Sequence, residues 1–198
     1  DLSKEKQPEK YFSEPHPNAW HGTMTAVVCA GDGYLSHGLY RGIACDAELV
    51  LLNVMNDDGH IPAENIIRAL QWVLQYHKEY GIRIVNMSLG DDAAISYKQS
   101  EIDKLAEQLI GEGIVVVAAV GNDENGMIKP PANSPGVIAV GGVDDHNRLE
   151  EVSNPYHSTY GTTVDGLYKP ELLAHAIWIA APILPGTPEQ AESEILHR

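Results

Sequence analysis

The chain has 198 residues, of which 43% are hydrophobic, and a formal net charge of −15. This length suits one domain with a sizeable core, and the composition is that of a globular protein. The acidic balance argues against a nucleic-acid partner, because phosphate binding requires clustered Lys and Arg. No run approaches the roughly 18 apolar residues of a membrane span, and two cysteines, Cys29 and Cys45, make neither a disulfide framework nor a zinc site.

The N-terminal third begins with a polar lead-in and a short helix. Residues 1–19 are rich in Lys, Glu and Pro without an apolar period, which predicts a loop. The stretch WHGTMTAVVCAG, Trp20 to Gly31, places a His-Gly-Thr triplet before small and apolar residues that predict a core helix containing Cys29. A histidine at the edge of such a helix, His21, would be held by the core and still be accessible to a substrate.

Strands and helices then alternate. The apolar runs 47–55, 82–89, 114–120 and 136–143 have the length of buried strands. Two amphipathic helices are expected between them, at 63–81 and 100–113, each ending at a glycine. This alternation, with short connections, predicts an α/β fold with a mainly parallel sheet between helices. In such folds the working residues follow the carboxyl ends of the strands.

Asn122 follows a predicted buried strand and a glycine. Its residue type has two interpretations. Asn is a common turn former that tolerates unusual backbone angles. Its side-chain amide could instead point into a cleft and stabilise a developing oxyanion. This position alone favours the turn.

The catalytic interpretation of Asn122 gains support from six segments that occur in order along the chain: HGT, YRGIACDAELVLLNV, VNMSLG, GIVVVAAVGN, SPGVIAVGGVD and DGLYKPELLA. Together they resemble the subtilisin-like serine proteases, the subtilases, over roughly Trp20 to Pro185. The resemblance implies a three-layer α/β/α fold, which agrees with the periodicity. Two departures, Cys45 in place of a proline and Ala174-His175-Ala176 in place of Ala-Pro-Gly, indicate a divergent member.

The resemblance also implies roles for individual residues. His21 would be the general base of a Ser-His-Asp triad, and Asn122 the side-chain donor of the oxyanion hole. One edge of the substrate cleft would pair with the substrate as an added strand and consist of Ser88, Leu89 and Gly90. The opposite wall, around the residue before the scissile bond, would consist of Ala118, Ala119 and Gly121.

The other two members of the triad have no match in the sequence. Family members carry Asp, His and Ser in that order, but no Asp-Ser/Thr-Gly triplet precedes His21, and Asp1 lacks the strand context. No Gly-Thr-Ser follows the KPELLA segment: Gly186-Thr187 is followed by Pro188, and Ser193 lies in an acidic amphipathic stretch. We therefore expect residues 1–198 to be a partial catalytic domain, with 186–198 beginning an insertion before the serine segment.

Two functional hypotheses stay open at this point. In the first, the chain is the central portion of a serine endopeptidase that acts on peptides or proteins, with Asp and Ser outside it, so that the fragment alone is inactive. In the second, it is a catalytically silent peptide-binding or assembly module. Apolar strand faces and an unpaired edge would be exposed in either, so we expect association with the missing segments or with another copy.

No cofactor is predicted. Many subtilases bind calcium, and the chain has three oxygen-rich turns, NDDGH, GNDENG and VDDHN. None of them follows the D-x-D-x-D-G ligand spacing, and turns commonly have this composition. A dinucleotide site is also not expected, because the glycine-rich stretch GDGYLSHG follows a helix rather than a strand.

Overall fold

The computed structural model describes residues 19–146, 148 and 154–196. By its internal contacts the chain divides into two compact units, residues 1–53 with 179–198 (unit 1) and residues 54–178 (unit 2). The predicted lead-in, residues 1–19, lies outside the described residues except for Ala19. The expected single domain over 1–198 stays a prediction, and each unit is described by itself.

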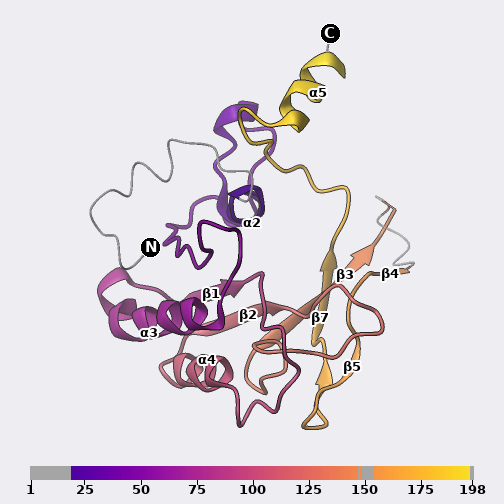
Figure 1. Ribbon diagram of the computed structural model, residues 1–198. Coiled ribbons are helices and arrows are strands. Elements are labelled where there is room, and N and C mark those ends of the chain that lie inside the picture. Colours follow the sequence, from indigo (N-terminus) through magenta and orange to yellow (C-terminus); the bar gives the residue numbers. More distant parts are fainter. Residues whose placement is uncertain (1–18, 147, 149–153, 197–198) are drawn as a thin grey trace. The chain divides into compact units, whose positions relative to one another are not determined.

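Unit 2 contains the sheet. Strands β1 (Ile84–Met87), β2 (Val115–Ala119), β3 (Ile138–Asp144) and β7 (Leu172–His175) run parallel, and β4 (Asn154–Tyr156) pairs with β3 in the opposite direction. A separate antiparallel pair is formed by β5 (Gly161–Thr162) and β6 (Tyr168–Lys169). Figure 1 shows β1, β2, β3 and β7 together with the two long helices of this unit. The predicted mainly parallel α/β architecture is confirmed.

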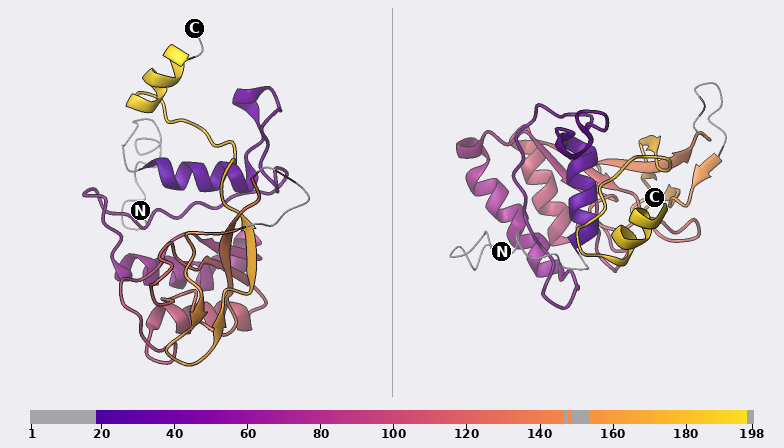
Figure 2. Two further views of the ribbon diagram at one scale, coloured as in Figure 1. Left: turned by 90° about the vertical axis from the view of Figure 1, so that its right-hand side faces the viewer. Right: turned by 90° about the horizontal axis from the view of Figure 1, so that it is seen from above.

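Two amphipathic helices cover one face of the sheet. Helix α3 (Ala63–Tyr80) packs against α4 (Glu101–Gly111), and α4 packs against β2; the two views of Figure 2 show the helices side by side. Each buries an apolar stripe, and the sheet supplies the other half of the core. Fully buried members are Ile66, Ile102, Leu109, Ile128, Val116 and Val137.

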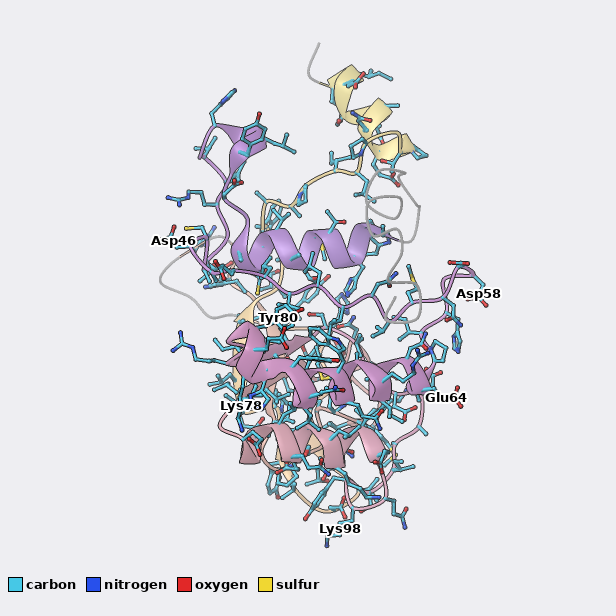
Figure 3. The ribbon with its side chains drawn as sticks, turned by 90° about the vertical axis from the view of Figure 1, so that its left-hand side faces the viewer. Asp46, Asp58, Glu64, Lys78, Tyr80 and Lys98 are labelled. Carbon is cyan, nitrogen blue, oxygen red and sulfur yellow. The ribbon has the colours of Figure 1, made fainter. Side chains whose placement is uncertain are left out.

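The ends of these helices follow from their sequences. Ser100 precedes α4, and its hydroxyl accepts a hydrogen bond from the Asp103 N–H at 3.1 Å, which satisfies a free donor of the first turn. Helix α3 ends at Gly81, which has a left-handed φ of 64°. Figure 3 shows Glu64 at one end of α3 and Lys78 at the other, the charge order that a helix dipole favours.

Unit 1 contains helix α2 (Trp20–Ala30), the short 3₁₀ helix η2 (Tyr34–Ser36) and helix α5 (Pro188–Leu196). The predicted helix after the His-Gly-Thr triplet is present, but the expectation that it is a core helix is wrong: none of its residues is buried, and Cys29 is exposed. The physical reason is that every described strand belongs to unit 2, so α2 has no sheet within its own unit to pack against.

The predicted strand at 47–55 is also not observed. This segment makes no sheet pairing in the structure, and Leu49, Val50 and Leu51 are exposed. A run of β-branched and aliphatic residues favours an extended chain, but a strand also needs a hydrogen-bonding partner. At the level of single strands the burial also differs from the expectation, because β2 alternates between exposed and buried residues and Val115 is 45% exposed.

The C-terminal segment forms a capped helix. Thr187 Oγ1 accepts from the Gln190 N–H, and the Gln190 side chain accepts from the Gly186 N–H at 2.6 Å, which resembles a capping box. The hydroxyl of Ser193 donates to the Gln190 carbonyl within the same helix. No helix in the described part of the chain is both long and apolar enough to cross a membrane.

Candidate active site

A cavity of about 290 Å³ lies at the carboxyl ends of β1 and β2. These strands are parallel neighbours in register, with Met87 opposite Ala118, so their ends leave the sheet at the same edge. The segments after both strands line the cavity, together with the loop 126–130 and one residue from a later segment. The lining residues are Ser88, Leu89, Gly90, Asp91, Ala119, Val120, Gly121, Asn122, Asp123, Gly126, Met127, Lys129, Pro130 and Thr159.

The wall that follows β1 is fixed by the neighbouring loop. The Asp91 N–H donates to the Pro130 carbonyl at 2.9 Å. A Cβ at Gly90 would lie 3.0 Å from that same carbonyl oxygen, so the close approach favours glycine. Within the wall, Asn86 Nδ2 donates to Ser88 Oγ at 3.1 Å. The backbone after β1 is therefore held beside the cavity, with Ser88 and Leu89 half-buried.

The wall that follows β2 carries Asn122. Val120 donates its N–H to the Val140 carbonyl, which continues the β2–β3 pairing to the end of the strand. Gly121 then adopts a φ of 112°, a conformation that a residue with a Cβ rarely adopts. This turn leaves Asn122 exposed at the cavity, where its side-chain amide has two N–H donors to offer.

The structure brings together six of the eight residues singled out from the sequence. These six residues line one cavity: Ser88, Leu89, Gly90, Ala119, Gly121 and Asn122. Ala118 does not line the cavity. Alternate residues of a strand face opposite sides of the sheet, and Ala118 is on the buried side, with 1% of its surface exposed. His21 belongs to unit 1, in the exposed first turn of α2, where its ring contacts that of Trp20 edge to face.

Thr159 is a cavity residue that the sequence did not reveal. It follows Asn122 by 37 positions and belongs to no recognisable motif, so only the folded chain brings it to the end of β2. Met127 and Lys129 reach the cavity from the loop after Asn122, and they too lack a local signal. Within the described residues, no three His, Cys, Asp or Glu side chains are grouped so as to hold a metal ion.

The parallel sheet, the helices on its face and a cavity at the carboxyl ends of adjacent strands define an α/β protein with a strand-end site. The subtilase family model matches residues 1–193, and the chain belongs to the subtilase family. The predicted family membership is thereby confirmed.

Individual relatives agree with this membership. The chain is 35% identical to the serine protease AprX of Bacillus subtilis (strain 168) over 83% of its own length and 39% of that protein. It is 29% identical to subtilisin-like protease 3 of Pseudogymnoascus destructans (strain ATCC MYA-4855 / 20631-21), over 80% of its length and 36% of that protein. The chain thus spans less than half of either relative.

Solved structures show the same fold. Sphericase superposes with a TM-score of 0.70 at 24% identity, over 84% of this chain and 55% of that one. The S41 psychrophilic protease superposes with a TM-score of 0.68 at 23% identity, over 81% and 53% of the two chains. The chain therefore has a partial subtilisin-like α/β fold.

Proposed function

We propose that the protein containing this chain is a serine endopeptidase and that the chain supplies its general base, its oxyanion donor and its substrate cleft. The observation that supports the proposal most directly is the convergence of Ser88, Leu89, Gly90, Gly121 and Asn122 on one cavity. These residues follow two neighbouring strands, and all five match the family's segments in the sequence.

The chemistry assigned to the chain has three parts. The His21 imidazole takes the proton from a serine hydroxyl as the oxygen attacks the peptide carbonyl, and then delivers it to the leaving amine. The Asn122 amide donates a hydrogen bond to the oxyanion of the tetrahedral intermediate. The backbone at Ser88–Gly90 pairs with an extended substrate and holds the carbonyl in place.

The serine nucleophile and the aspartate that orients His21 are assigned to segments outside residues 1–198. No segment of this chain carries either residue in the family's sequence context. Without a nucleophile no acyl-enzyme can form, so the 198 residues alone are expected to be inactive. No metal or other cofactor is part of the proposal.

A fluorophosphonate probe tests this assignment, because it reacts covalently with an activated serine. The complete encoded protein, freed of any prodomain, is expected to be labelled, whereas the 198-residue chain is not. His21→Ala should abolish labelling. His60→Ala is the matched control, because His60 is an exposed histidine outside the proposed site. A folded full-length protein that is not labelled would instead favour the silent peptide-binding module.

A further inference from the structure

Thr159 forms hydrogen bonds to the two residues that flank Asn122 in its turn. The Thr159 N–H donates to the carbonyl of Gly121 at 3.1 Å. Its hydroxyl accepts from the Asp123 N–H at 3.3 Å and donates to the Asp123 carbonyl at 2.8 Å. One residue thus binds the peptide units before and after Asn122, and its hydroxyl acts as both donor and acceptor.

These contacts lie where the turn is otherwise weakly restrained. Sheet pairing ends at Val120, and the next hydrogen bond within the loop's own backbone joins the Gly126 N–H to the Asp123 carbonyl. Between them lie an exposed asparagine and a glycine with a φ of 112°. Glycine has the largest backbone freedom of any residue, so this turn needs an external restraint to hold one conformation.

Thr159 is itself rigidly placed. Its side chain is 2% exposed, and its hydroxyl would lie 2.9 Å from a Cβ added to Gly121. The preceding residue, Ser158, is 3% exposed; its hydroxyl accepts from the Gly142 N–H of β3 at 2.6 Å and donates to the Tyr156 carbonyl. The sheet therefore holds Ser158, and the adjacent Thr159 holds the turn.

We propose that Thr159 is a positioning residue for the oxyanion donor: its N–H fixes the peptide unit before Asn122 and its hydroxyl fixes the backbone after Asn122, so that the Asn122 amide is already aligned before the oxyanion forms. This inference rests on the proposed endopeptidase function. Its physical basis is that a preorganised donor costs no reorganisation during the reaction, and that a displacement of about 1 Å can cost about 100-fold in rate.

The test compares four variants of the complete protein using a peptide substrate, with active-site titration to count correctly folded enzyme. Thr159→Val keeps the shape and removes both hydroxyl bonds. We expect kcat to fall about 10- to 100-fold while KM changes by less than about 2-fold. Thr159→Ser restores the hydroxyl and should return kcat to within about 3-fold of wild type.

Two further variants separate positioning from general stability. Thr163→Val is the matched control: this threonine is also buried, but its hydroxyl accepts from the Leu167 N–H and does not line the cavity. It should lower Tm and leave kcat within about 3-fold. In the Asn122→Ala background, Thr159→Val should reduce kcat by less than about 2-fold, because the group that it positions has been removed.

Three results would overturn the proposal: a wild-type kcat for Thr159→Val, an equal kcat loss for Thr163→Val, or a full Thr159→Val loss in the Asn122→Ala background. A wild-type protein without activity or fluorophosphonate labelling would contradict the endopeptidase function itself and remove the inference with it. A labelled, active wild type combined with any of the three results would contradict the role of Thr159 alone.

Discussion

The two units build their parts of the proposed site in different ways. His21 is carried by α2, a helix without a buried residue, whose last carbonyls are satisfied by the backbone of 42–44. Asn122 is carried by a turn at the end of a sheet strand, beside helices that bury five residues each. The turn that carries Asn122 is held through Thr159, which follows a residue bonded to the sheet, whereas α2 is held within its unit mainly by backbone hydrogen bonds. Each prediction below tests this contrast.

The largest effect is expected from the buried carboxyl of Asp103 in α4. Burial raises its pKa from 3.8 to about 7; Ser100 opposes the rise, and the charges of Glu107, Asp91 and Asp165 reinforce it. A raised pKa means that the folded state holds the proton more tightly. The free energy of unfolding should therefore fall as pH rises from about 4 to about 7, by about 4 kcal/mol in total.

Asp103→Asn should remove most of this pH dependence of the free energy of unfolding, and should make the protein more stable than wild type at pH 8. Urea unfolding at pH 4, 6 and 8 measures both. Asp92→Asn, at an exposed position, is the control and should leave the slope unchanged. An Asp103→Asn variant with the wild-type slope would show that another group causes the pH dependence.

Asn122→Ala tests the donor on the sheet side. Loss of a side-chain oxyanion donor costs roughly 100- to 1000-fold in kcat, a magnitude established on subtilisin, a member of this family. We expect that loss in the complete protein with KM nearly unchanged, because the bond forms chiefly in the transition state. Steady-state kinetics on a peptide measures it. Asn125→Ala, on the same loop and exposed, should retain activity.

Lys169→Met tests how β7 is attached to β3. The Lys169 ammonium is almost fully buried, donates to the Val137 carbonyl at 2.8 Å and pairs with Glu171 Oε1 at 2.5 Å. Glu171 Oε2 in turn accepts from the Ala139 N–H. Removing the ammonium leaves a carboxylate and a carbonyl without their cation, and should lower the free energy of unfolding by about 2–3 kcal/mol. Lys98→Met, at an exposed lysine, should change it by less than about 0.5 kcal/mol.

Gly42→Ala tests the backbone contact that holds α2, and has the smallest predicted effect. A Cβ at Gly42 would lie 2.6 Å from the backbone nitrogens of Ala30 and Gly31, so the loop must move away from the helix end. We expect a loss of about 1–2 kcal/mol, with faster amide exchange at Ile43 and Ala44, whose N–H groups donate to α2 carbonyls. Gly22→Ala, with open space around its Cβ, is the control. Equal exchange in both variants would contradict the proposed role of this contact.

Helices α2, α3 and α4 and strands β1, β2 and β3 could be predicted from local pattern. The apolar stripe of α3 and the glycine that ends this helix are short-range signals, and each lies where the pattern placed it. The segment 47–55 could not be assigned in this way. Its apolar run fits a buried strand, but whether it pairs depends on a neighbour that the local sequence does not contain.

The residues of the candidate site also differ in whether the local sequence could predict them. Ser88, Gly90 and Asn122 could be named because they follow strands in order and match family segments, and parallel strands end at a common edge. Thr159 could not, because its role comes from a contact across 36 positions with the Asp123 backbone. Ala118 lies in a segment that matches the family, but it does not line the cavity. Alternate residues of a strand face opposite sides of the sheet, and Ala118 is on the buried side.

The sequence by itself determined the family, the alternation of helices and strands, and the residues that flank the cleft, because periodicity and motif order are properties of the linear chain. Only the tertiary structure decided which side chains meet. Hydrogen bonds such as those of Thr159 to the Asn122 turn join residues that are distant in sequence, and their formation depends on the whole sheet being in register.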